Sequence, residues 1–298
     1  MEYFNLIINI VEQAGLFALV AMGVYITYKI LDFPDLSVDG TYPLGASIAA
    51  ILLVNGINPI IATLMAMLGG AAAGFITAFL HVKLKITNLM SGILVMMAMY
   101  SVNLLVMGKS NTSLLGIKTV FSNNISKILI IVVIMIIFKL IIDIFMKTKA
   151  GFLLFAVGDN EQVVTSLGVN KNTVKIIGLM ISNALVALAG GLTAQYNGFA
   201  DVGSGTGIVV KGLACVIIGS SLLGRIKFIK STSQAIIGTL IYYVAITLAL
   251  RWQLNPNLLN LLTALVIVIA LSVQNGVFSN IKRKKKGGVE VAEGKEVI

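Results

Sequence analysis

Nine apolar segments constrain the fold of this chain more than any other feature. A helix needs about 20 mostly apolar residues to cross a bilayer, and backbone polar groups in lipid must be satisfied within the segment, which favours helices. The segments lie at about residues 12–31, 42–56, 59–80, 87–107, 128–146, 174–194, 207–223, 233–250 and 257–276. The sequence therefore predicts an all-α fold, a polytopic membrane helix bundle that forms a single domain over residues 1–298.

The composition agrees with a membrane protein and excludes several other classes. Hydrophobic residues make up 58% of the chain and charged residues 11%, whereas a soluble domain carries about 25% charged residues. The net charge of +10 is spread over the loops, so it indicates membrane topology rather than nucleic-acid binding. Cys215 is the single cysteine, which excludes an internal disulfide or a cysteine-based metal cluster.

The basic residues predict the orientation of the bundle, because cytoplasmic loops are enriched in lysine and arginine. With the carboxyl terminus inside, sixteen of the 22 basic residues fall on the cytoplasmic side and four fall outside. The outside set is Lys109, Lys118, Lys127 and Arg251, and the two within spans are Lys139 and Lys211. This distribution places the amino terminus outside.

Two stretches 166 residues apart repeat each other. Residues 18–21 (ALVA) recur at 184–187, and Phe33-Pro34-Asp35 recurs as Phe199-Ala200-Asp201. An odd number of spans separates the copies, so the second copy is expected to be inverted, as in transporters. We expect repeat one at about 12–107, a linking helix at 128–146, a cytoplasmic loop at 147–173, repeat two at about 174–276, and a basic cytoplasmic tail at 277–298.

Each repeat contains a short, broken element before a short span. Pro34 and several carboxylates interrupt the first, and small residues interrupt the second, so neither can lie as a regular helix in hydrocarbon. One interpretation is that these elements shape a gate or translocation path, and the other is that their side chains cap the helices at 42–56 and 207–223. The candidate residues are Asp35, Ser37, Asp39, Gly40, Asp201, Gly203, Gly205 and Lys211. Lys211 either lines a vestibule or extends to the outer surface.

The cytoplasmic loop is the longest polar stretch between spans. Asp159 and Asn160 are good N-cap residues, and residues 161–167 can form two helical turns with Val163, Val164 and Leu167 on one side. Gly168 then provides a helix stop. The loop is either a docking helix for a partner or an ordinary connection.

The loop and the segments after it resemble a known family. The runs AGFLLFAVGDNEQVVTSLGVNKNTVK and VVKGLACVIIGSSLLGR are similar to permeases of ATP-binding cassette importers, in the branched-chain amino acid and ribose permease superfamily. The resemblance implies that the loop is the coupling helix that enters a groove of the ATPase. The corresponding residues are Gly158, Asp159, Asn160, Glu161, Gln162, Val164, Leu167 and Gly168.

The resemblance also implies partners and location. It predicts a dimer of ATP-binding cassette ATPases, an extracytoplasmic substrate-binding protein, and a second permease copy, as a homodimer in a bacterial plasma membrane. No phosphate-binding G-x-x-x-x-G-K-[ST] motif is present, so ATP and magnesium are expected on the partner and no cofactor on this chain. No enzymatic motif is present either.

The solute is constrained only by the amino-terminal half. The segment ALVAMGVYITYKILDFPDLSVDGTYPLGA is similar to a permease subgroup associated with aromatic amino acid uptake. We therefore expect a branched-chain or aromatic amino acid, with a sugar or nucleoside as the alternative. A secondary transporter driven by an ion gradient is a further alternative, for which Lys139 and Asp143, spaced i, i+4, are the only candidate charged pair.

Overall fold

The structure is a computed structural model that describes residues 2–122, 125–224 and 230–251, together with residues 258, 261, 263–265, 267–268 and 272. Its helices are α1 (Glu2–Val24), η1 (Tyr25–Ile30), α2 (Val38–Val54), α3 (Pro59–Val82), α4 (Asn88–Met107), η2 (Val120–Ser122), α5 (Lys127–Phe145), α6 (Lys149–Asp159), α7 (Glu161–Ser166), α8 (Lys171–Asn197), η3 (Val202–Gly205), α9 (Ile208–Leu223) and α10 (Ser231–Arg251). Two short strands, β1 (Asn111–Ser113) and β2 (Phe199–Asp201), pair in antiparallel register.

Seven of the described helical segments are long and apolar enough to cross a membrane. The first predicted span starts earlier than expected, because the apolar helix runs from Phe4 to Ile30 with η1, a π-helix, at its end. The second predicted span is the 17-residue helix α2, which is shorter than the seven spanning segments. Of the ninth, at 257–276, the structure describes residues 258, 261, 263–265, 267–268 and 272, and the tail at 277–298 lies outside the described residues. The count of nine and the inversion of the repeats remain predictions.

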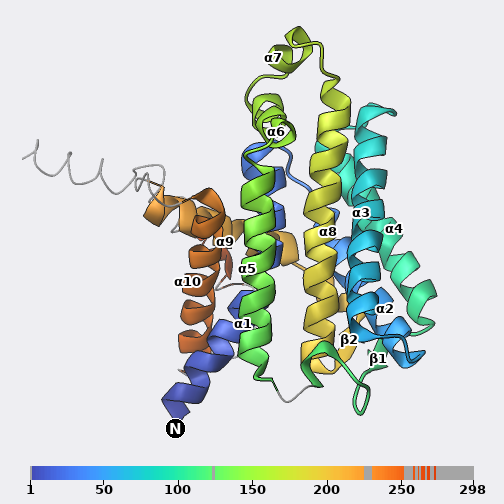
Figure 1. The fold of residues 1–298 in the computed structure, drawn as a ribbon, viewed down its shortest axis with the longest axis vertical. Coiled ribbons are helices and arrows are strands. Elements are labelled where there is room, and N and C mark those ends of the chain that lie inside the picture. The colour runs from blue at the N-terminus through green and yellow to red at the C-terminus, as the bar shows by residue number, and fades with distance from the viewer. Residues whose placement is uncertain are drawn as a thin grey trace, which may run out of the picture.

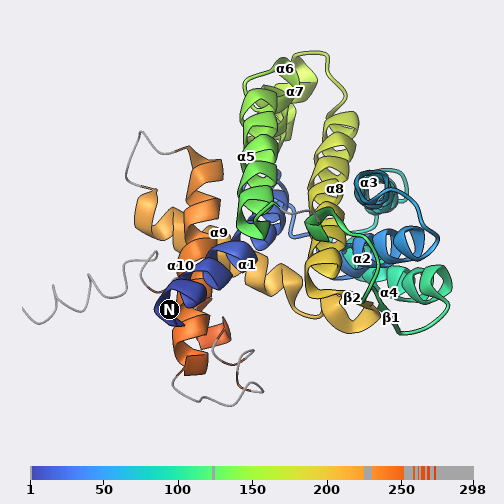
Figure 2. The same cartoon turned by 60° about the horizontal axis from the view of Figure 1, so that its bottom comes forward.

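The helices form two groups on either side of α5 and α8 (Figures 1 and 2). Helices α1, α9 and α10 lie on one side, and α2, α3 and α4 lie on the other. Helix α8 packs against α1 as well as against α2 and α3, so it joins the two groups. The short helices α6 and α7 extend from one end of the bundle, and β1 and β2 lie at the opposite end (Figure 1).

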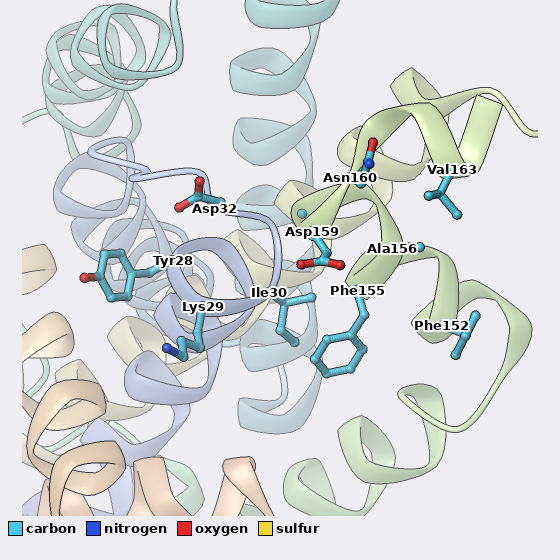
Figure 3. A pocket seen from close by; sticks show the side chains of 11 residues that line it. Tyr28, Lys29, Ile30, Asp32, Phe152, Phe155, Ala156, Asp159, Asn160 and Val163 are labelled. Atoms are coloured by element: carbon cyan, nitrogen blue, oxygen red, sulfur yellow. The ribbon is translucent and has the colours of Figure 1, made fainter. Parts of the chain in front are cut away.

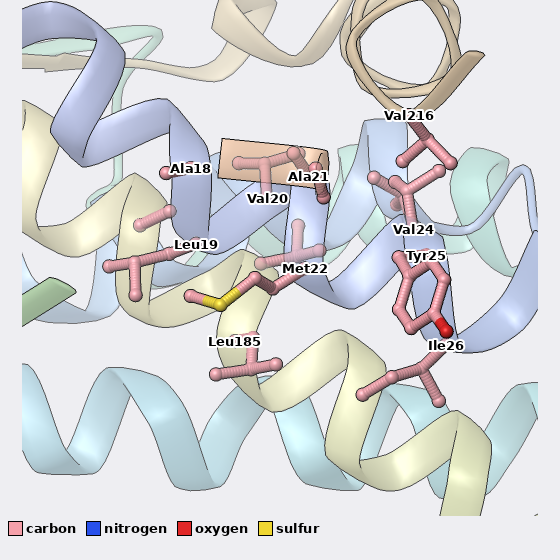
Figure 4. Packing of buried hydrophobic residues seen from close by; sticks show 14 of the residues in the cluster. Ala18, Leu19, Val20, Ala21, Met22, Val24, Tyr25, Ile26, Leu185 and Val216 are labelled. Atoms are coloured by element: carbon pink, nitrogen blue, oxygen red, sulfur yellow. The ribbon is translucent and has the colours of Figure 1, made fainter. Parts of the chain in front are cut away.

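The core is centred on the second half of α1, residues 14–24, which is apolar around the whole helix. Such a helix is expected in the interior of a bundle rather than at its surface. Val20 and Met22 of α1 are fully buried, and Met22 points toward Leu185 of α8 (Figure 4). On another face of α1, Val24 lies against Val216 of α9 (Figure 4).

Glycines allow α8 to approach α2 and α3 closely. A Cβ atom built on Gly74 of α3 would lie 2.4 Å from the carbonyl oxygen of Leu179, and one on Gly70 would lie 2.4 Å from that of Asn183. Gly45 of α2 meets the backbone of Ala187 in the same way. Since no side chain fits at these positions, Gly70 and Gly74 of α3 mediate packing within this chain.

Contacts between basic residues and distant helices agree with the predicted sidedness. At the α7 end, the Nζ atom of Lys175 lies 3.4 Å from Nε2 of His81, which places the end of α3 beside the start of α8. At the opposite end, Nζ of Lys127 lies 5.4 Å above the ring of Tyr196, near the end of α8. The α7 end of the bundle thus carries Lys175, which was assigned to the cytoplasm, and the opposite end carries Lys127, which was assigned to the outside.

Candidate coupling and path sites

The cytoplasmic loop folds into two helices rather than one. Helix α6 begins after Thr148, whose hydroxyl oxygen accepts a hydrogen bond of 3.3 Å from the backbone N–H of Gly151. Sequence reasoning missed α6, because only a short turn separates this helix from the apolar end of α5. Asp159 is its last residue, so the prediction that Asp159 is an N-cap was wrong.

Helix α7 is the predicted docking helix, with confirmed boundaries on both sides. The side-chain oxygen of Asn160 accepts a hydrogen bond of 2.9 Å from the backbone N–H of Gln162, which is an N-cap contact. Gly168 has a φ of 73°, in the left-handed region that favours glycine, and it ends the turn that follows α7.

The apolar residues of α7 have different environments. Val164 is fully buried and anchors α7 to the bundle, whereas Val163 is 49% exposed and Leu167 is 62% exposed. Gly158, just before α7, packs directly on the carbonyl oxygen of Ile30 at the end of η1. Gly158 and Val164 thus hold the loop to the bundle, while Val163 and Leu167 present apolar side chains outward.

Glu161 binds two lysines of the same chain. Its carboxylate forms ion pairs of 2.6 Å with Nζ of Lys171 and 2.5 Å with Nζ of Lys175. Hydrogen bonds from Lys171 and then from Lys175 lower the pKa of Glu161 to about 2. The carboxylate therefore fastens α7 to the first turns of α8. Sequence reasoning missed these partners, which are 10 and 14 residues further along the chain.

A cleft of about 720 Å³ lies between η1 and the α6–α7 pair (Figure 3). Tyr28 and Lys29 line one side, and Phe155 and Asp159 line the other. Phe152, also at the cleft, is 70% exposed. A wide, open cleft with exposed aromatic side chains and a few charges suits contact with another protein.

A second polar site is buried between the helices. One carboxylate oxygen of Asp35 accepts hydrogen bonds from the backbone N–H of Ser37 at 2.9 Å and from its hydroxyl at 2.6 Å. The other oxygen accepts a hydrogen bond of 2.7 Å from the side-chain amide of Asn183 in α8. These bonds fix the extended segment before α2 to the middle of α8. Asn183 was not predicted, although an asparagine within an apolar span is itself a signal.

The start of α2 contacts the start of α9. The carboxylate of Asp39 accepts hydrogen bonds from the backbone N–H groups of Gly207 (3.0 Å) and Val209 (2.7 Å). Asp39 therefore caps α9, one of the two short helices named in the capping interpretation. Gly205 packs on the carbonyl oxygen of Asp39, and the carbonyl oxygen of Gly40 accepts a hydrogen bond from Asn103. The structure thus brings Asp39, Gly40 and Gly205 together.

Asp201 and Lys211 line a smaller cleft of about 240 Å³. One oxygen of Asp201 accepts a hydrogen bond of 2.6 Å from the backbone N–H of Gly203, so Asp201 caps the short helix η3. The cleft is bounded by α1, α2, α8, α9 and α10, near the end of the bundle that carries β2. Lys211 therefore faces an internal cleft.

The predicted pair of Lys139 and Asp143 is confirmed at 2.8 Å. Asp143 also accepts from Nζ of Lys230 at 2.9 Å and from the hydroxyl of Thr232 at 2.5 Å. Both carboxylate oxygens are therefore bound, and the cluster connects the end of α5 to the start of α10.

Comparison with known proteins decides the family. The permease component of the branched-chain amino acid transport system matches residues 6–271. The chain belongs to this permease family. It is 47% identical over 292 residues to a tyrosine transport system permease protein of Clostridioides difficile, covering 98% of this chain and 99% of that protein. No solved structure matches it.

Other family members with different named solutes are more distant. The chain is 27% identical over 293 residues to the ribose import permease of Escherichia coli K12, covering 91% of this chain and 86% of that protein. It is 28% identical over 297 residues to an autoinducer 2 import permease of Yersinia enterocolitica, covering 95% and 81%. This permease is therefore a multi-pass protein of a bacterial plasma membrane and a subunit of an ATP-binding cassette importer.

Proposed function

We propose that this permease forms the translocation path for an amino acid, and in particular an aromatic amino acid. The observation that carries the proposal is the full-length similarity to a tyrosine transport permease, at an identity well above that of the ribose permease. A sugar is the second candidate solute, because sugar permeases also match over most of the chain.

The α6–α7 pair and its cleft form the proposed docking surface for the ATPase. These two helices project beyond the long helices at one end of the bundle (Figure 1). The docking surface combines the matched motif residues 158–168 with the exposed side chains of Phe152, Val163 and Leu167. ATP and magnesium bind to the partner, and this chain supplies only the contact through which hydrolysis is coupled to movement.

A chain of contacts connects α7 to the buried polar site at Asp35 and Asn183. Glu161 fastens α7 to Lys175 of α8, and Asn183 lies eight residues later on the same helix, about 12 Å along its axis. Asn183 holds Asp35, which precedes α2, and Asp39 at the start of α2 holds α9. Displacement of α7 would thus move α8 and both short helices together.

The complete importer contains two copies of this permease, two ATPase subunits and an extracytoplasmic binding protein that delivers the solute. Each copy has nine spans, arranged as two inverted repeats of four helices around α5. Support comes from the internal sequence repeat and from the two short helices, α2 and α9, which follow broken elements and meet at Asp39.

Copurification of the ATPase tests the docking surface. Leu167→Asp should abolish association with the ATPase, because it places a charge on an exposed apolar contact. Leu115→Asp is the matched control, since Leu115 is 82% exposed and closely follows β1, which lies at the opposite end of the bundle. The double charge reversal Asp159→Arg with Glu161→Arg should also insert into the membrane but lose the ATPase. Unimpaired association of the Leu167 variant would reject the assignment.

Uptake by the complete importer tests the solute. Radiolabelled tyrosine should accumulate in vesicles that contain permease, ATPase and binding protein, and excess phenylalanine should compete with it. Ribose should not compete. Accumulation of ribose without any amino acid uptake would favour the second candidate.

A further inference from the structure

The cleft at Lys211 has aromatic walls. Phe17 of α1 and Tyr243 of α10 line it, with ring centroids 5.7 Å apart and an interplanar angle of 61°. Tyr42 of α2 lines it as well. Edge-to-face aromatic arrangements of this kind leave ring surface that favours a further aromatic group.

Lys211 brings a cation into this aromatic cleft. Within the described residues, its ammonium group has no hydrogen bond or ion pair within bonding distance. Asp39 acts on it electrostatically, but the carboxylate oxygens of Asp39 are bound to the N–H groups of Gly207 and Val209. A half-buried ammonium group without a hydrogen bond or ion pair at bonding distance is costly in a membrane protein, and it commonly marks a ligand site.

The opposite charge is available in the same cleft. Asp201 lines it, and its second carboxylate oxygen accepts only a long hydrogen bond of 3.3 Å from the side-chain amide of Asn111. That oxygen retains capacity for an ammonium group. One cleft thus offers a cation, an anion and aromatic walls, which is the complement of a zwitterion with an aromatic side chain.

We propose that the cleft is a solute subsite that selects aromatic amino acids, with the solute carboxylate on Lys211, its ammonium on Asp201 and its ring against Phe17, Tyr42 and Tyr243. The inference rests on the proposed function and deepens it, because it assigns selectivity to the permease in addition to the binding protein. A neutral sugar would offer Lys211 no carboxylate.

Protection of a cysteine at the cleft wall tests the subsite. Ser204 lines the cleft and is exposed, whereas Cys215, the only native cysteine, is buried, so Ser204→Cys supplies a single reactive thiol. L-Tyrosine should slow maleimide labelling of this variant in membranes that contain the assembled importer. Tyramine, which lacks the carboxylate, and ribose should not.

The charge of Lys211 is tested in the same background. Adding Lys211→Met should raise the tyrosine concentration needed for protection about tenfold or more, because a charge-assisted hydrogen bond is lost. Lys211→Arg should retain most of the protection. Lys118→Met is the control, because Lys118 is exposed and does not line the cleft. Without solute and at a low maleimide concentration, each variant should be labelled at the same rate as the Ser204→Cys parent. An equal rate establishes that the fold is intact.

The outcomes separate this inference from the proposed function. Equal protection by tyrosine with and without Lys211→Met would overturn the subsite, as would protection by ribose or tyramine. Absence of protection in an importer that accumulates tyrosine would overturn the subsite and leave the proposed function intact. Absence of any amino acid uptake by the unmodified importer would overturn the proposed function itself.

Discussion

The carboxylate of Asp39 accepts a hydrogen bond of 2.7 Å from the backbone N–H of Val209, 170 residues further along the chain. This contact joins the first turn of α2 to the first turn of α9, the two short helices that follow the broken elements of the repeats. Two N–H groups at the start of α9, those of Gly207 and Val209, are thus satisfied by a residue of α2.

We expect Asp39→Ala to reduce both stability and uptake. Loss of an N-cap costs about 0.5–2 kcal/mol, and the N–H groups of Gly207 and Val209 would lose their hydrogen-bond partner in a partly buried site. Thermal unfolding in detergent and tyrosine uptake measure the two effects. Asp39→Asn keeps a side-chain oxygen and should retain part of both. Wild-type behaviour of the alanine variant would show that the cap has no role.

Close packing of α3 on α8 predicts a different kind of defect. Gly74→Val should destabilise the permease by about 1–3 kcal/mol, because its side chain would collide with the backbone of Leu179. Ala72→Val, on the exposed side of the same helix, is the matched control and should be neutral. The midpoint of thermal unfolding is the measurement. Equal midpoints for the two variants would contradict the observed packing.

The Asp143 cluster is suited to a double-mutant cycle. Asp143→Leu should cost about 3 kcal/mol, because it leaves Lys139 and Lys230 without their shared carboxylate. The double variant Asp143→Leu with Lys139→Met should be more stable than Asp143→Leu alone, since one unpaired charge is removed. If the double variant loses at least as much free energy of unfolding as the two single variants lose together, the pair is not coupled.

The ion pairs of Glu161 predict a pH dependence on the cytoplasmic side. The pKa of its carboxyl is lowered from 4.5 to about 2 in the folded protein. The ion pairs therefore stabilise α7 fully above pH 4.5, and this stabilisation is lost as the pH falls toward 2. Replacement of Lys171 and Lys175 by methionine should return this pKa toward 4.5. Carbon-13 NMR of labelled glutamate measures it, and Glu161→Gln identifies the signal. An unchanged pKa in the lysine variant would contradict the ion pairs.

The sequence predicts this fold well where one type of interaction dominates. The apolar segments locate α3, α4, α5 and α8 because lipid requires long continuous helices. The cap at Asn160 and the stop at Gly168 follow from local backbone chemistry and are confirmed. The pairing of Lys139 with Asp143 follows from helix periodicity.

Contacts between residues distant in the sequence were not predictable in this way. Asp39 was expected to cap a helix, but local propensity does not reveal that the helix is α9. The same holds for Asn183 with Asp35, because their contact depends on how α8 crosses the segment before α2. Lys211 could be assigned to either a cleft or the outer surface from sequence, and only the arrangement of five helices around it distinguishes the two.

The central claim is that this permease moves solute only when an ATPase acts on it through the α6–α7 pair. Tyrosine accumulation in proteoliposomes, with the binding protein supplied outside and ATP inside, tests that claim most directly. The account predicts accumulation against a gradient when the ATPase is present and none when it is omitted, whatever proton or sodium gradient is applied. Accumulation by the permease without the ATPase would contradict it.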